Sequence, residues 1–307
     1  MEKTNVKSTQ KRVAVVTGGN KGIGLEICRQ LALSGVTVVL TARNEDRGIE
    51  AIEKLKVSGF DGDVVFHQLD VKDPTSVARL AKFVETQFKK LDILVNNAAE
   101  SGIIVKYDEF RAFKDGAGYE QVYDENAHLL TGILEQPYDL GEKCVKTNFY
   151  GTKGVTEAFL PLLHLSDSPR IVNISSNYGE LHWIHNEKVK AEFQDIENLT
   201  EERIDAIIEW FLRDLKENKL SENGWPLTVA AYKVSKAAIN AYTRLLARKF
   251  GNILVNCVHP GYVITDITSH TGHLTPEEGA RAPVMVALLP DNGPSGVYFN
   301  QMEISPF

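Results

Sequence analysis

The chain has 307 residues, a net charge of -7 and an ordinary mixture of apolar and charged residues, which is typical of a globular protein with a sizeable core. This acidic balance excludes a broad basic surface, so we expect no nucleic-acid partner. No apolar run reaches membrane-spanning length, the polar segment 1–12 lacks the apolar part of a signal peptide, and three widely spaced cysteines fit a reducing compartment. We therefore predict a cytoplasmic protein with no membrane partner.

Apolar strand patterns alternate with helical patterns along the chain. Strands are predicted at residues 13–16, 37–41, 64–69, 93–96, 170–174, 254–258 and 296–299. Helical periodicity predicts helices near residues 22–34, 45–58, 74–89 and 200–218. This alternation implies an α/β protein with a doubly wound parallel sheet and helices on both faces, forming a single domain over residues 1–307.

Two segments interrupt the alternation, at about residues 100–141 and 182–226. Each follows a predicted strand, so each is expected at the carboxyl edge of the sheet, where open α/β sheets bind ligands. The second contains the amphipathic pattern at 200–218, in which Thr200 is a candidate N-cap and the apolar stripe predicts a packed face. We therefore expect both insertions to form a substrate pocket and its lid.

The first predicted strand runs directly into a glycine-rich turn, which opens the first helix. Its residues are Thr17, Gly18, Gly19, Asn20, Lys21, Gly22, Ile23 and Gly24. Glycines allow a tight turn and a close approach of backbone to a pyrophosphate, and the helix N-terminus supplies N–H groups to the anion. Strand, turn and helix together predict a dinucleotide-binding site.

Tyr232 and Lys236 lie four residues apart in a helical pattern, so they share one face of a helix. The ammonium group of Lys236 is expected to lower the pKa of the phenol, which could then transfer a proton near neutral pH. Alone, this spacing usually marks an ordinary exposed helix face. Its combination with the glycine turn favours a catalytic pair.

Several segments in one order resemble the short-chain dehydrogenase/reductase family over nearly the whole chain. They are the glycine turn, Leu69-Asp70-Val71, Asn96-Asn97-Ala98-Ala99, Asn148, Ile174-Ser175-Ser176, Tyr232 with Lys236, and Pro260-Gly261-Tyr262-Val263-Ile264-Thr265. One departure is Ala99, which stands where the family has glycine. The resemblance implies a Rossmann-type fold and a nicotinamide cofactor.

The resemblance also implies a catalytic set of four residues. Tyr232 would donate a proton to the substrate oxygen, and Ser176 would polarise and place that oxygen. Lys236 would stabilise the phenolate and hold the nicotinamide ribose. Asn148 would hold a water molecule that connects Lys236 to solvent.

Cofactor contacts are implied for the motif residues at the carboxyl ends of the predicted strands and for the catalytic pair. They are Gly18, Asn20, Lys21, Gly22, Ile23, Gly24, Arg43, Asp70, Val71, Asn97, Ala98, Tyr232, Lys236, Pro260, Gly261, Val263 and Thr265. Arg43 follows the second strand, where an NAD-specific site carries a carboxylate, and Lys21 adds a second cation. Both suit a 2′-phosphate, so NADPH/NADP+ is the predicted cofactor, although Arg43 is also interpretable as a plain surface residue.

Ser176 and Tyr232 are much further apart than in simple family members, and the long segment between them resembles the monomeric carbonyl reductases. Segments 66–70 and 165–172 bring the chain closer to a plant branch that includes salutaridine reductase and the menthone/neomenthol reductases. This resemblance implies a monomer that reduces a small hydrophobic cyclic ketone, of terpenoid or alkaloid type, to a secondary alcohol. Two alternatives stay open: a reductase of the carbon–carbon double bond of an enone, whose relatives carry an acid in place of the tyrosine, and a non-catalytic NADP(H)-binding regulator.

Tyr178 and Tyr262 follow the strands of catalytic segments, and each is interpretable either as a core residue or, with Ser176, as a substrate contact. His182 and His185 lie three residues apart, but no cysteine or carboxylate cluster completes a ligand set, so no metal site is predicted.

Overall fold

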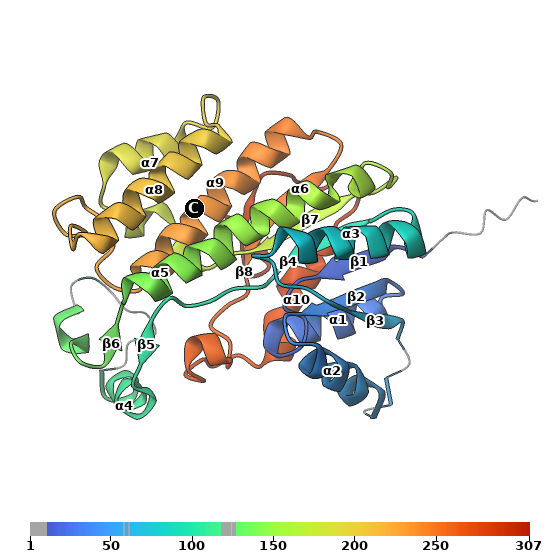
Figure 1. Cartoon of the computed structure of the whole chain (residues 1–307), viewed down its shortest axis with the longest axis horizontal. Coiled ribbons are helices and arrows are strands. Elements are labelled where there is room, and N and C mark those ends of the chain that lie inside the picture. The colour runs from blue at the N-terminus through green and yellow to red at the C-terminus, as the bar shows by residue number, and fades with distance from the viewer. Residues whose placement is uncertain (1–10, 58, 61, 118–123, 125–126) are drawn as a thin grey trace, which may run out of the picture.

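The computed structural model describes residues 11–57, 59–60, 62–117, 124 and 127–307. Within these residues a central sheet has the strand order β10-β9-β8-β7-β4-β1-β2-β3 and is parallel except for the antiparallel β9–β10 pair (Figure 1). Its strands are β1 (Val13–Val16), β2 (Thr37–Ala42), β3 (Val64–Gln68), β4 (Ile93–Asn96), β7 (Arg170–Ile174), β8 (Leu254–His259), β9 (Tyr298–Asn300) and β10 (Glu303–Ser305). The strands β5 (Ile104–Val105) and β6 (Leu134–Glu135) form a separate antiparallel pair.

Helices cover both faces of the sheet. They are α1 (Gly22–Leu33), α2 (Glu45–Val57), α3 (Pro74–Phe88), α4 (Tyr107–Ala117), α5 (Tyr138–Val145), α6 (Thr152–Leu163), α7 (Glu187–Gln194), α8 (Glu201–Lys216), α9 (Ala230–Lys249) and α10 (Pro276–Ala287). Short helical turns are η1 (Ala127–Leu130), η2 (Lys146–Gly151), η3 (Asn177–Gly179), η4 (Leu181–Trp183) and η5 (Asp266–Thr268). Several helix starts are capped as their sequences dictate: the Asp73 side chain accepts from the Thr75 N–H, and Thr275 forms a capping box with Glu278.

Two apolar cores lie on opposite faces of the sheet, because the side chains of each central strand alternate between them. In β1, Val13 and Val15 pack into the core beneath α3, α6 and α9, whereas Ala14 and Val16 pack into the core beneath α1 and α10. The four strands around the centre are buried on both faces, which explains their continuous apolar sequences. The predicted doubly wound parallel sheet is therefore confirmed.

The two insertions occupy different places around the carboxyl edge. The first contributes the β5–β6 pair and α4, which lie together at the lower left of Figure 1, away from the main body of helices. The second contributes α7 and α8, which pack beside α9. The apolar stripe of α8 is buried, and Thr200 caps this helix by accepting from the Arg203 N–H, so both sequence expectations for this segment are confirmed.

The predicted strands and helices all form, with ends that differ by one or two residues. The strand predicted at 296–299 is β9, and it is followed by β10, which the sequence did not predict. The β5–β6 pair, α4, α7 and α10 were also missed. Each of the missed strands is only two or three residues long, so none carries a readable alternation.

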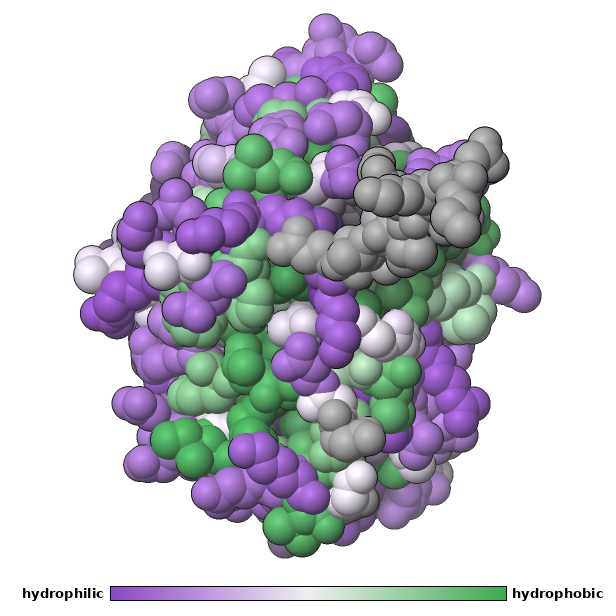
Figure 2. Space-filling model, turned by 90° about the vertical axis from the view of Figure 1, so that its right-hand side faces the viewer, coloured by the Kyte–Doolittle hydropathy of each residue, from purple (hydrophilic) through white to green (hydrophobic). Residues whose placement is uncertain are grey.

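No helix among the described residues is both long and apolar enough to cross a membrane. The face on the right-hand side of Figure 1 is mainly polar, and its apolar side chains gather in the lower half of the view in Figure 2.

Candidate active site

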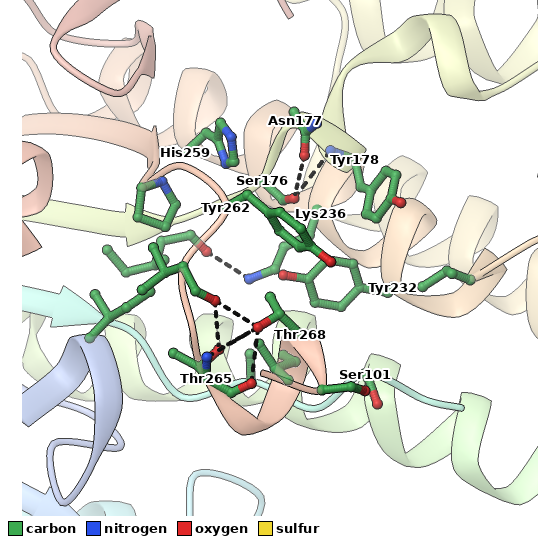
Figure 3. Close-up of a pocket in the computed structure, with 18 of the residues that line it drawn as sticks. Ser101, Ser176, Asn177, Tyr178, Tyr232, Lys236, His259, Tyr262, Thr265 and Thr268 are labelled. Atoms are coloured by element: carbon green, nitrogen blue, oxygen red, sulfur yellow. Dashed lines mark hydrogen bonds between the residues drawn. The ribbon is translucent and has the colours of Figure 1, made fainter. Parts of the chain in front are cut away.

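The predicted site residues follow the carboxyl ends of parallel strands or lie on α9 and η2. Because those strand ends share one edge of the sheet, residues that are distant in sequence meet there. A cavity of about 1040 Å³, counted with its open mouth, lies at this edge. Ser176, Tyr232 and Lys236 all line it (Figure 3).

The remaining walls of the cavity are mostly apolar and come from the segments after β1 and β8, from the first insertion and from the residue before α9. Apolar lining residues are Ile23, Ile103, Val105, Phe110, Leu134, Val229, Val263 and Ile267. The residues of α4 and of the β5–β6 pair were not singled out from the sequence, since their segment has weak periodicity. Only its position after β4 indicated that it could form a pocket wall.

Ser176 follows β7 and caps the short helix η3. Its Oγ accepts from the Tyr178 N–H at 3.2 Å and donates to Asn177 Oδ1 at 3.1 Å. Ser176 and Tyr232 line the same cavity, and the interaction with Ser176 acts to lower the pKa of the Tyr232 phenol. The neighbouring Ser175 is committed elsewhere, because its hydroxyl donates to Asn240 Oδ1 at 2.6 Å. Of the two serines, Ser176 is therefore the one that affects the tyrosine, and its catalytic role stays a prediction.

Tyr232 and Lys236 lie in the first two turns of α9. The Lys236 ammonium donates to the Ile174 carbonyl at 2.7 Å and lies 5.3 Å from the centre of the Tyr232 ring. Burial raises the pKa of the Tyr232 phenol, and the interaction with Ser176 opposes this only in part. Burial also lowers the pKa of Lys236 to about 8.

The prediction that Lys236 lowers the pKa of Tyr232 is therefore wrong for the protein alone. Loss of solvation on burial penalises the phenolate, and this effect outweighs the opposing interaction with Ser176. The consequence is a phenol that keeps its proton near neutral pH, which is the state from which it can donate.

Asn148 lies on η2, a π-helical turn between α5 and α6, and π-turns within helices frequently mark functional sites. Its Oδ1 accepts from the Glu100 N–H at 2.8 Å, and its Nδ2 donates to the Glu100 carbonyl and to Ser235 Oγ, both at 3.0 Å. Asn148 thus fastens the loop after β4 to α9. Its predicted contact with a water molecule stays a prediction.

The glycine turn after β1 is shaped by close backbone contacts. Gly18 and Gly22 have φ angles of +64° and +54°, which glycine adopts without strain. A Cβ on Gly24 would lie 2.4 Å from the Gly18 carbonyl oxygen and 2.5 Å from Asn97 Nδ2. Asn97 Nδ2 in turn donates to the Thr17 and Gly18 carbonyls at 3.0 and 3.1 Å. The loop after β4 therefore holds the turn in shape.

Both predicted phosphate-binding cations form ion pairs across this edge. Arg43 Nη1 lies 3.3 Å from Glu100 Oε1, and Lys21 pairs with Asp266. The hydrogen bond from Lys21 is the main cause that lowers the pKa of Asp266. Neither carboxylate was predicted, although each directly follows a recognised motif. The sequence signal that could have found Glu100 and Asp266 is their position directly after motifs that follow β4 and β8, at the edge where the other site residues lie.

The remaining predicted cofactor residues lie along the same edge. Pro260, Gly261, Val263 and Thr265 line the cavity, as do Ile23 and Asn97. Outside it are Gly18, Asn20, Lys21, Gly22, Gly24, Arg43, Asp70, Val71 and Ala98. Gly22 and Gly24 are in the first turn of α1, and the others are in the loops that follow β1 to β4.

Tyr178 and Tyr262 both line the cavity. The Tyr178 ring stands edge-on to the Tyr232 ring, with centroids 6.4 Å apart. The Tyr262 hydroxyl forms a hydrogen bond with Thr271. Lys114, on α4, places its ammonium 4.9 Å from the Tyr262 ring centre. The contact of Tyr178 and Tyr262 with a substrate stays a prediction.

His259 is a cavity residue to which the sequence assigned no definite role. Burial lowers its pKa to about 4, so its imidazole is neutral near pH 7. Among the residues that the structure describes, no group of three or more His, Cys, Asp or Glu side chains could hold a metal ion.

Three features of the carboxyl edge of the sheet suit the binding of a dinucleotide. The turn has glycine where a Cβ would clash, the N-terminus of α1 opens beside it, and Lys21 and Arg43 place two cations at its flank. The cavity next to it holds the serine, the tyrosine and the lysine.

A parallel sheet, a phosphate-binding turn and this trio define a class of nucleotide-dependent oxidoreductases, and the chain belongs to the short-chain dehydrogenase/reductase family. The family described as short chain dehydrogenase matches residues 12–188, and that described as enoyl-(acyl carrier protein) reductase matches residues 220–291. The protein is thus an oxidoreductase that acts on C=O or CH–OH groups with a nicotinamide cofactor.

Several relatives of the chain are plant enzymes. The chain is 52% identical over 300 residues to (+)-neomenthol dehydrogenase of Arabidopsis thaliana, covering 96% of this chain and 98% of the relative. It is 50% identical over 309 residues to salutaridine reductase of Papaver bracteatum, covering 97% of each. The solved structure of salutaridine reductase from Papaver somniferum superposes with a TM-score of 0.86 at 49% identity, covering 94% of this chain and 99% of that one.

Proposed function

We propose that the protein is an NADPH-dependent carbonyl reductase that converts a small hydrophobic cyclic ketone, of terpenoid or alkaloid type, into a secondary alcohol. The observation that carries the proposal is the convergence of Ser176, Tyr232 and Lys236 on one cavity whose other walls are mostly apolar. Such a cavity favours an apolar substrate held by a single polar group. The names of the plant relatives support this substrate class.

The reaction needs a proton at the carbonyl oxygen. The nicotinamide, when bound, supplies the hydride. Ser176 donates a hydrogen bond to the carbonyl oxygen, and Tyr232 gives its phenolic proton to the same oxygen, completing the hydroxyl group. The raised pKa of the phenol keeps that proton in place until negative charge develops on the oxygen.

Lys236 acts on the tyrosine through its charge. Its ammonium group faces the Tyr232 ring and is fixed by the Ile174 carbonyl, so it stabilises the phenolate that proton transfer leaves behind. Asn148 holds the loop after β4 against α9 and, in this proposal, also holds the water through which the proton is replaced.

Arg43 and Lys21 support NADPH as the cofactor. Lys21 is part of the glycine turn, and Arg43 follows β2, where a carboxylate would hold the ribose hydroxyls of NAD. Glycines 18, 22 and 24 let the backbone approach the pyrophosphate.

A screen of cofactor consumption tests the proposal. Monoterpenoid ketones, alkaloid ketones and aromatic aldehydes are incubated with the protein and either NADPH or NADH, and the products are identified by mass spectrometry. We expect NADPH oxidation with cyclic ketones and secondary alcohols as products. A saturated ketone formed from a cyclic enone would show double-bond reduction instead, and no oxidation across the panel would contradict an enzymatic role.

We also propose that the protein is a monomer formed as one catalytic domain. The helix α8 buries its apolar face against α5 and α9, so it covers a surface of these two helices that a second subunit would otherwise need. Sedimentation equilibrium at micromolar concentration would give the mass of one chain, 34.1 kDa.

A further inference from the structure

Glu100 joins the predicted cofactor site to the predicted catalytic site. Its carboxylate contacts two cations, with Oε1 lying 3.3 Å from Arg43 Nη1 and Oε2 lying 2.8 Å from Lys143 Nζ. Its backbone N–H and carbonyl are both bonded to the side chain of Asn148, and Cys144 Sγ also donates to the carbonyl. Glu100 is thus held through its carboxylate, its backbone N–H and its backbone carbonyl.

The strand order shows what the Arg43–Glu100 pair crosses. Arg43 directly follows β2, and Glu100 lies in the loop that follows β4. In the sheet, β1 lies between these two strands. The ion pair therefore spans the carboxyl end of β1, above the glycine turn that is expected to hold the pyrophosphate.

The side chains of Glu100 and Arg43 differ in how tightly the rest of the protein holds them. Glu100 is fixed by Asn148 through its backbone and by Lys143 through its second oxygen, and its side chain is 24% exposed. The Arg43 side chain is 59% exposed and has a long flexible stem. If the pair opens, Arg43 is the partner that moves, and Lys143 still neutralises the carboxylate.

We infer that Glu100 is a specificity-determining residue that competes with the 2′-phosphate of the cofactor for the guanidinium group of Arg43. The inference rests on the proposed NADPH preference. The phosphate takes over the role of the carboxylate, and Arg43 turns from the loop after β4 toward the ribose. Glu100 thus limits the advantage of NADPH over NADH, because the same cation must first leave a carboxylate.

Direct binding measurements test this inference without any substrate. Dissociation constants of NADPH and NADH are measured by fluorescence titration for the wild type, Glu100→Gln, Arg43→Met and the double variant. Glutamine keeps the size of the side chain and leaves the backbone contacts with Asn148 intact. We expect Glu100→Gln to bind NADPH about threefold more tightly, since exposed pairs of this kind are weak, with a smaller change for NADH.

The double-mutant cycle isolates the contact. In the Arg43→Met background, Glu100→Gln should leave the ratio of NADPH to NADH affinity unchanged. Glu50→Gln is the matched control, because it removes the same charge from an exposed pair with Lys54 on α2, outside the edge of the sheet. Glu50→Gln should change neither the dissociation constant of NADPH nor that of NADH. Thermal unfolding confirms that each variant is folded.

Weaker NADPH binding in Glu100→Gln would overturn the inference, since it would mean that the carboxylate places Arg43 for the phosphate. An equal gain for both cofactors, or a gain that persists without Arg43, would overturn it as well. A different result would contradict the proposed NADPH preference itself: unchanged NADPH binding in Arg43→Met alone. In that case the inference about Glu100 would fail as well.

Discussion

The buried catalytic groups and the exposed phosphate-facing cations are held in different ways. Lys236 is only 2% exposed and is tied to a backbone carbonyl at the end of β7. Lys21 and Arg43 have side chains that are 61% and 59% exposed, and each pairs with a carboxylate side chain across the edge. Backbone partners cannot leave without unfolding a strand, whereas side-chain partners can be exchanged.

This difference separates two tasks. At the catalytic end, fixed partners and burial set the protonation state of Tyr232 and Lys236. At the phosphate end, weak exposed pairs keep cations ready for an anion without fixing their position. Variants of the two regions should therefore affect different quantities: turnover at the first, and cofactor affinity at the second.

The largest effect is expected from Tyr232→Phe. Removing the only proposed proton donor should lower kcat about a thousandfold and leave the dissociation constant of NADPH unchanged. Tyr242→Phe on the same helix is the control, because the Tyr242 hydroxyl is buried with no hydrogen-bond partner among the described residues. Stopped-flow NADPH oxidation measures both variants, and retained turnover in Tyr232→Phe would contradict the mechanism.

A smaller loss is expected from Ser176→Ala, which removes the donor that polarises the carbonyl. We expect kcat/KM to fall about a hundredfold. Ser175→Ala deletes a hydrogen bond to Asn240 instead, so it should lower the unfolding free energy by about 1 kcal/mol and affect turnover far less. Equal kinetic losses in the two variants would show that the pair acts only through local structure.

The pH dependence of kcat/KM should show the titration of the buried Lys236. Lys236 is charged below its pKa of about 8 and loses the proton above it, so kcat/KM for reduction should fall by about tenfold per pH unit on the alkaline side. Tyr232, whose pKa is raised, stays protonated over this range. Lys236→Met should retain low activity without this descending limb, and a limb that persists in the variant would assign it to another group.

At the cofactor end, Gly24→Ala should weaken NADPH binding by about tenfold, because its Cβ would press on the Gly18 carbonyl and the Asn97 amide. Gly154→Ala on α6 is the control: nothing lies within 4 Å of the added carbon, and alanine favours a helix. Isothermal titration calorimetry compares the two. Normal binding in Gly24→Ala would mean that the turn can relax.

Much of the fold and site could be predicted because the signals are local. The apolar run of β1, the glycines after it and the four-residue spacing of Tyr232 and Lys236 are each contained in a short stretch of sequence. The parallel sheet then brings strand ends together by a general rule, so motif residues from distant segments could be expected at one edge. The short β5–β6 pair and α4 carried no such signal, and the composition of the pocket walls went unpredicted with them.

By itself, the sequence determined the family and the doubly wound parallel sheet, and it supplied the candidate proton donor, Tyr232. Only the tertiary structure decided the direction of the Tyr232 pKa, because burial depends on what packs around the phenol rather than on its neighbours in the chain. The tertiary structure likewise paired Arg43 with Glu100, residues 57 positions apart. Coulomb and desolvation energies depend on distance and solvent exposure in space, and neither quantity is written in the spacing of residues along the chain.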